Sequence, residues 1–427
     1  MTIADEPALT STHIRVDLHR GTDYPAELAA LRKRVDGDKF SARPGGRFDA
    51  NDDAGEHALV YRDGALVVAV ASLATEASDF ITHSGHAAEH VSHTFLLTGI
   101  AVDPSDKSQG YLALAIYTAM RQQRMAGRTH YVAMVENGEP RLSQMLRTSP
   151  IRSVPGREVQ GTDGQTRTLV AVEGRIDEAM LRCFEAMNEE QRDTLRDGFI
   201  AEIRAAVMAG VDKFVVNPFF LAARAGTLSQ EQYTYAMGNQ HHLVRFTTRI
   251  LGLAVGACED PSLRKHYAHH LSGEVNHEVW IEDDLAYLDA DVDYVKNVMV
   301  PEAAILKFCF IQESLTSFRR DPVVFMGVPI AIEGAAAFTP MESIEGIREC
   351  IRSWGYDSPK LGTRFLASHV HADGGHEDHE GHWDGTLRMM KDYVRTESQH
   401  QQILRVIRLV FESLNTAYAG YVAQPSL

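Results

Sequence analysis

The sequence predicts two domains of different fold class, an α/β domain over residues 1–175 and an all-α helical bundle over residues 176–427. In the first part, short apolar runs rich in β-branched residues alternate with turn signals and one helical stretch. From about residue 177 onward, apolar residues recur at helical spacing almost without interruption. The 427 residues are enough for two or three domains of ordinary size. The change of period near residues 172–178 sets the predicted boundary.

The composition excludes several classes of partner. Hydrophobic residues make up 44% and charged residues 23%, as in soluble globular proteins. The net charge of −16 repels phosphate backbones, so we expect no nucleic-acid partner. No apolar run approaches the ~20 residues that span a bilayer, and the N-terminus lacks the pattern of a signal peptide. The four cysteines form no CxxC pair, which indicates a reducing compartment. We therefore expect a cytoplasmic protein without a membrane partner.

The N-terminal elements follow from local patterns. Residues 57–73 form a predicted hairpin, in which two apolar runs flank the turn at residues 62–64. A strand is predicted over residues 94–103, a helix ended by glycine over residues 110–127, and a strand over residues 130–136. Strand, turn, helix and strand in this order indicate a βαβ-type unit.

The C-terminal elements are predicted to be helices. Plausible N-caps support two of them: Ser229 begins the helix predicted over residues 229–256, and Asp260 precedes Pro261 in the helix predicted over residues 260–288. The clearest helical patterns cover residues 187–210, 229–256, 260–288 and 398–422.

Two groups of metal-ligand residues stand out among these helices. Glu274 and His277 are three apart on one predicted helix and should share a face, although such a pair is also common on a solvated surface. His369, Asp373 and His376 fall within an arc of about 60° at ~100° per residue. A surface histidine cluster or a solvated loop is the alternative for this second group, because two glycines follow Asp373.

Glu333 completes the predicted site. It lies in the apolar stretch 323–338, where a carboxylate is costly to bury unless it is paired or bound to metal. The alternative is that the stretch ends near Ile332 and that Glu333 is exposed. Mixed carboxylate and imidazole ligation suits iron or manganese, and six ligands exceed what one zinc ion takes. We therefore predict two metal ions held by Glu274, His277, Glu333, His369, Asp373 and His376.

These motifs resemble the heme-oxygenase-like diiron oxygenases, relatives of thiaminase II and of the PQQ-synthesis C protein, over residues 184–427. Glu274 and His277 match the second-helix ligands and Glu333 matches the third-helix glutamate. The pattern HxxxDxxH, with the three residues of the second group, matches the fourth helix. Some members carry a further carboxylate on the first core helix, where this chain has Asn239 to His242. His242 is a possible replacement ligand there, and a packed or pocket-lining histidine is the alternative.

The resemblance implies a heme-oxygenase-like bundle in which these six residues are both metal ligands and catalytic residues. It implies two Fe(II) ions per chain, O2 as a reactant, and a homodimer. The reactions of the family imply N-oxygenation or oxidative C–C cleavage of a small amine, amino acid or acyl-amino acid. The sequence does not choose among these substrates.

The N-terminal domain resembles a different family. Residues 98–127 are similar to the acyl-CoA-binding motif of GNAT acyltransferases, which implies that Val102 and Gly110 border a bound acyl-CoA-like cofactor at a helix N-terminus. Residues 31–73 are similar to acyl-homoserine-lactone synthases and N-acyl amino acid synthases. The matching residues are Arg32, Asp49 and Asp52. Glu136 and Asn137 lie where such folds place acceptor contacts, and the alternative is that they are turn residues. The alternative is a domain without turnover that recognises a substrate or carrier protein, or that only dimerises.

Three functions are compatible with the sequence. The first is a diiron oxygenase fused to an acyltransferase-like domain, which is favoured by the complete ligand set. The second is an N-acyltransferase that uses acyl-CoA or acyl-carrier protein and has a non-catalytic helical domain. The third is a metal- or oxygen-responsive binding protein.

Overall fold

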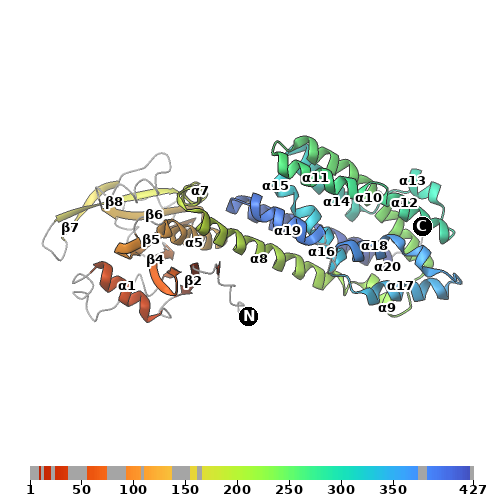
Figure 1. Cartoon of the computed structure of the whole chain (residues 1–427), viewed down its shortest axis with the longest axis horizontal. Coiled ribbons are helices and arrows are strands. Elements are labelled where there is room, and N and C mark those ends of the chain that lie inside the picture. The colour runs from red at the N-terminus through yellow and green to blue at the C-terminus, as the bar shows by residue number, and fades with distance from the viewer. Residues whose placement is uncertain are drawn as a thin grey trace. The chain divides into compact units, whose positions relative to one another are not determined.

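The computed structural model describes residues 9–10, 14–20, 25–36, 55–74, 93–106, 110–136, 154–160, 166–373 and 382–423. The chain divides into two compact units (Figure 1). The first comprises residues 1–198 with 396–398, and the second comprises residues 199–395 with 399–427. The division along the chain falls within one long helix, α8 (Glu189–Phe214).

The described part of the first unit contains an eight-stranded sheet in the order β1-β2-β3-β4-β5-β6-β8-β7. Among these described strands, only β5 and β6 pair in parallel, and helix α5 (Tyr111–Met125) connects them, as the predicted βαβ unit requires. The predicted hairpin is also confirmed: Asp63 and Gly64 join β3 to β4 with φ of 50° and 80°. The strands are β1 (Leu9–Thr10), β2 (Ile14–Arg20), β3 (Glu56–Arg62), β4 (Ala65–Ala74), β5 (Thr94–Val102), β6 (His130–Glu136), β7 (Val154–Gln160) and β8 (Thr166–Arg175).

Helices cover both faces of this sheet. Leu28 and Leu31 of α1 (Ala26–Asp36) belong to one buried cluster with Leu59 of β3. On α5, Gln123 donates hydrogen bonds to Glu56 of β3 and Ser72 of β4. Because side chains alternate along a strand, Leu59 and Glu56 lie on opposite faces, so α1 and α5 lie on opposite sides of the sheet. Helix α7 (Ile176–Ala186) packs beside α5.

The described part of the second unit is helical and contains no strand. Helix α10 packs against α11, α12 and α14, while α16 packs against α18 and α19 (Figure 1). No single helix among the described residues has the length and hydropathy to cross a membrane, although two bent helix pairs meet those criteria jointly. Besides α8, the elements are α9 (Pro218–Arg224), α10 (Gln230–Ala257), α11 (Pro261–Glu274), α12 (His277–Tyr287), α13 (Val292–Asn297), α14 (Ala303–Glu313), the π-helical turn η5 (Ser314–Phe318), α15 (Pro322–Phe325), α16 (Gly327–Ala337), α17 (Met341–Ser353), η6 (Pro359–Gly362), α18 (Arg364–Asp373), α19 (His382–Tyr393) and α20 (Glu397–Ala423).

The predicted helix starts are confirmed at two caps. Ser229 accepts a hydrogen bond from the backbone N–H of Gln232, whose side chain reaches back to the cap, and this forms a capping box for α10. Asp260 accepts hydrogen bonds from the N–H groups of Ser262 and Leu263 at the start of α11.

The prediction of one continuous helix over residues 260–288 is wrong. Helix α11 ends at Glu274 and α12 begins at His277. Between them, Val275 is extended, with φ −61° and ψ 129°, and Asn276 is left-handed, with φ 74°. Asparagine tolerates this left-handed conformation better than most residues, which allows the chain to break here.

Candidate metal centre

Three predicted ligands converge although they lie on three different helices. Glu274 ends α11, His277 begins α12 and His369 lies on α18. One potential ligand atom from each lies within 4.8 Å of the other two. His277 Nδ1 is 3.0 Å from Glu274 Oε2, and the two side chains are only 12% and 14% exposed. The pair thus meets across the helix break rather than along one helix face.

Glu333 joins this group from α16. It is 4% exposed and lies inside the helix, so the alternative in which it is exposed is wrong. His270 Nε2 lies 3.4 Å from Glu333 Oε1 and 3.6 Å from Glu274 Oε1, and this histidine links the two carboxylates. Gly334 allows the close packing, since a Cβ there would lie 2.4 Å from Val207 Cγ1.

The protonation states suit cation binding. Burial alone would raise the pKa of Glu274, but hydrogen bonds from His270 and His277 outweigh it and hold the pKa well below its usual range. His369 Nδ1 lies 2.9 Å from the carbonyl oxygen of Phe365. A carbonyl only accepts, so Nδ1 carries the proton and Nε2 keeps its lone pair for a metal.

Asp284 positions α18 relative to α12. It is 0% exposed, and its carboxyl oxygens accept hydrogen bonds of 3.0 Å from the backbone N–H groups of Arg364 and Phe365, the first two residues of α18. This cap fixes the helix that carries His369 onto the helix that carries His277. Burial raises the pKa of Asp284 to about 7, against the lowering effect of the two N–H groups.

Two adjoining spaces lie at this cluster. The metal chamber, about 60 Å³, is lined by His270, Glu274, Glu333, His369 and Gln312 among others. The apolar chamber, about 90 Å³, is lined by residues that include Phe214, Phe220, Ala336, Leu366, Leu414 and Tyr418. Both chambers are also lined by Gln240, Leu243, Ile332, Phe365 and His369, so this wall is shared. A molecule in the apolar chamber would therefore lie next to the metal cluster.

Other predicted residues are placed differently or remain predictions. His242 does not line either chamber; its ring lies 5.6 Å from that of His241, and burial lowers its pKa. This placement favours the packed-histidine alternative. Asp373 is the last residue of α18, where only the backbone is described, and His376 lies outside the described residues.

His270 and Gln312 are polar residues of the metal chamber that were not predicted from the sequence. His270 lies four residues before Glu274 on α11, a spacing that places both on one helix face and could have revealed it. Gln312 near the end of α14 has no comparable sequence signal. Only the packing of the helices brings it to the chamber.

The donor set fits iron or manganese. Among the described side chains it consists of one buried carboxylate, one partly buried carboxylate and three imidazoles, without a thiolate. Oxygen and imidazole ligands suit these metals. A nearly buried carboxylate such as Glu333 is costly in a protein interior unless a cation or hydrogen-bond donor compensates its charge.

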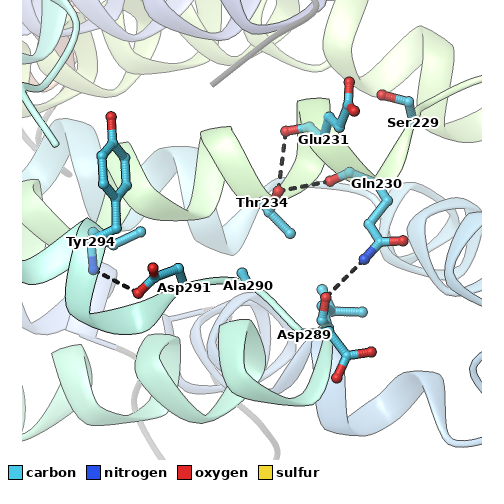
Figure 2. A pocket seen from close by; sticks show the side chains of 10 residues that line it. Ser229, Gln230, Glu231, Thr234, Asp289, Ala290, Asp291 and Tyr294 are labelled. Carbon is cyan, nitrogen blue, oxygen red and sulfur yellow. Dashed lines mark hydrogen bonds between the residues drawn. The ribbon is translucent and has the colours of Figure 1, made fainter.

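A more open cleft of about 500 Å³ lies where α10 begins, beside the segment that leads into α13. Figure 2 shows that its polar groups bond to neighbouring protein groups. Gln230 donates to the carbonyl oxygen of Leu288, Thr234 donates to that of Gln230, and Asp291 accepts from the N–H of Tyr294. No residue of the metal cluster lines this cleft, so we assign no chemistry to it.

The N-terminal unit contains the two residues expected near an acyl-CoA-like cofactor. Val102 ends β5 and Gly110 precedes α5 with a left-handed φ of 78°. The parallel pairing of β5 with β6 runs only from Thr94 to Leu97, and Gly99 has φ 57° where the register with β4 shifts. Beyond Leu97 no β5–β6 pairing is present among the described residues. The left-handed φ favours glycine at this position, and a Cβ there would also lie 2.6 Å from Gln191 Oε1 and 3.3 Å from the carbonyl oxygen of Ala186.

The remaining residues of that prediction are only partly described. Arg32 is buried on α1, with 3% exposure. Glu136 ends β6, and nothing is described of its side chain. Asp49, Asp52 and Asn137 lie outside the described residues.

No protein-family model matches the sequence, and no curated protein matches it significantly. Solved structures are similar to parts of the chain. A domain of unknown function with a heme oxygenase-like fold from Shewanella denitrificans is 15% identical, with a TM-score of 0.46, and covers 52% of this chain and 91% of its own. A TenA homologue from Pseudomonas syringae is 11% identical, with a TM-score of 0.45, and the match covers 52% of this chain and 92% of the homologue. The AHL synthase LasI is 15% identical, with a TM-score of 0.32, and the match covers 42% of this chain and 98% of the synthase.

Proposed function

We propose that the second unit is a non-heme diiron oxygenase that uses O2 to oxidise a small amine, amino acid or acyl-amino acid. The observation that carries this proposal is the convergence of Glu274, His277, Glu333 and His369 from four helices, beside a chamber lined mainly by apolar residues. His270 adds a fifth donor at the same place. Asp373 and His376 remain proposed ligands from the predicted helix stripe.

The protein residues have separable roles in this proposal. The carboxylates of Glu274 and Glu333 and the imidazoles of His270, His277 and His369 would hold the two irons. When bound, ferrous iron would supply the electrons that reduce and so activate O2, which side chains alone do not provide. The apolar wall excludes water and holds the substrate beside the metals. N-oxygenation and oxidative C–C cleavage are the proposed reaction types.

Anaerobic reconstitution with Fe(II) tests the proposal. We expect about two irons per chain, as in di-iron carboxylate bundles, and O2 consumption with a transient visible absorbance after mixing. Reversible metal uptake without O2 consumption would instead support a metal-responsive binding protein. Iron that stays absent even with candidate amines and acyl-amino acids would reject the oxygenase.

The end of the β5–β6 pairing at Leu97 and the nearby N-terminus of α5 favour a second function for the first unit. We propose that this unit is an N-acyltransferase that takes acyl-CoA or an acyl-carrier protein, with Val102 and Gly110 beside the donor. Titration of the full-length chain with acyl-CoA tests this. Absence of both acyl-CoA and carrier-protein binding would leave the unit without this role.

A cytoplasmic homodimer also remains a proposal. Leu306 and Phe310 of α14 and Phe318 of η5 are 49%, 64% and 73% exposed, and the two phenyl rings lie 6.5 Å apart. Exposed apolar side chains that gather in this way often mark an interaction surface. Light scattering of the purified chain gives the mass that decides between monomer and dimer.

A further inference from the structure

Gln312 is a buried amide without a partner at the metal chamber. Its side chain is 0% exposed, and neither Nε2 nor Oε1 has a hydrogen-bond partner within the described structure. Buried polar groups are nearly always hydrogen-bonded, because leaving one unpaired is unfavourable. Since Gln312 lines the metal chamber, a molecule in that chamber can satisfy both atoms.

Apolar side chains form much of the chamber that Gln312 lines. Leu251, Phe325 and Val328 are among them. Gln312 also lies two residues before the π-helical turn η5, a type of turn that is frequent at functional sites.

The adjoining apolar chamber restricts the rest of the ligand. None of its described lining residues is Asp, Glu, Lys or Arg. Its polar groups include Gln240, which accepts a hydrogen bond of 3.5 Å from the hydroxyl of Tyr418, and Thr339, which donates to the carbonyl oxygen of Ala335. These are neutral and already bonded, so a charged group placed there would lose its hydration without gaining a counter-ion.

We propose that the substrate carries a neutral carboxamide that pairs with Gln312 and a short hydrocarbon chain that occupies the apolar chamber. A carboxamide offers one acceptor and two donors, which complements the amide of Gln312 with two hydrogen bonds. A carboxylate offers only acceptors and adds negative charge beside Glu274 and Glu333, whereas an ammonium group offers only donors. This inference rests on the proposed oxygenase and narrows its substrate to an acylated amine, in which the amide takes the place of a free amine or a free carboxylate at Gln312.

The chamber volumes set the size of the probe. The metal and apolar chambers measure about 60 and 90 Å³, and together they approach the roughly 150 Å³ of an engineered cavity that binds benzene. A ligand of about six non-hydrogen atoms therefore fits without rearrangement. Butanamide has this size, and butanoate and butylamine supply the same chain with a different head group.

Calorimetric titration of the metal-free, full-length chain with these three compounds tests the proposal. We expect butanamide to bind more tightly than butanoate or butylamine. Gln312→Met keeps the length of the side chain but removes both hydrogen-bonding atoms, so it should weaken butanamide about tenfold. Its melting temperature should not fall, because an unpaired buried amide is replaced by an apolar group.

Two further variants test the apolar chamber. Ala336→Leu places bulk in the chamber and should weaken butanamide, whereas the matched control Ala337→Leu, on the same helix but not lining either chamber, should bind as wild type. The proposal would be overturned if the wild type bound all three compounds with equal affinity, or if Gln312→Met bound butanamide as the wild type does. Either result would mean that the amide of Gln312 binds water and not the ligand. Iron loading is measured separately, so a failed oxygenase with intact butanamide selectivity is distinguishable from a failed ligand assignment.

Discussion

Replacement of Glu333 by glutamine tests the metal centre most directly. Two metal sites occupied at a hundredfold excess over Kd stabilise the native state by about 5 kcal/mol. For a domain of about 200 residues, this corresponds to a rise in Tm of roughly 10–20 °C. Because Glu333 is 4% exposed and close to His270 and the Glu274 cluster, Glu333→Gln should lose half of this rise or more. The number of bound irons should fall from about two to one or fewer.

The assay is anaerobic thermal unfolding with and without Fe(II), together with a colorimetric iron count. Glu282→Gln is the matched control, because Glu282 also pairs with a histidine, His241 at 3.0 Å, but lines neither chamber. The control should keep the full rise in Tm and its iron. If Glu333→Gln keeps both as well, Glu333 is not a ligand and the assignment of α16 to the site is wrong.

Three other predictions address the neighbouring structure. The pKa of Asp284 is raised from its ordinary value of 3.8 to about 7 in the folded chain. Between these two pH values the carboxyl is therefore mostly protonated in the native state and mostly ionised in the unfolded chain. Its contribution to stability should therefore fall as the pH rises from about 4 to 7, by up to about 1.4 kcal/mol per pH unit. In denaturant unfolding, Asp284→Asn should lack this decrease of stability with pH. If the variant keeps the wild-type pH dependence, another group causes it. His371→Ala and His382→Ala should leave the iron count unchanged, because the helical period of the sequence predicts both outside the ligand stripe; a large loss of iron would show that the predicted register is wrong. Gly110→Val should destabilise the first unit by about 2–3 kcal/mol, since φ is 78° and Gln191 is close. Its iron count should match wild type, and an unchanged unfolding transition would contradict the close packing.

Local sequence patterns were sufficient for most of the elements. The strand predicted over residues 130–136 has those bounds in the structure, and the cap at Ser229 begins α10 as expected. These features depend on side-chain alternation and capping, which act within a few residues. Glu333 was also predictable, because a single carboxylate in a long apolar stretch indicates a buried, compensated charge.

Features that depend on tertiary packing were not predictable in the same way. The helical pattern continues through Val275 and Asn276, so periodicity gave no sign of the break. The spacing of His270 to Glu274 was visible in the sequence, but its contact with Glu333, 63 residues away, was not, because only folding brings those two side chains to 3.4 Å. Gln312 is informative only because its hydrogen bonds are missing, and a missing partner is a property of the three-dimensional surroundings.

The helix break and the cap at Asp284 together explain how three separate helices meet at one cluster. The break allows His277 to begin α12 while its ring nitrogen still contacts Glu274 at the end of α11. Asp284 follows His277 by seven residues, or about two helical turns, so both lie on the same face of α12. Asp284 binds the first two N–H groups of α18, and His369 follows four residues after the second of them. Since both histidines are thereby tied to α12, their ring centroids lie 4.7 Å apart. A site organised in this way has already met much of the conformational cost of ordering its ligands, so metal binding would need to reorganise the helices little.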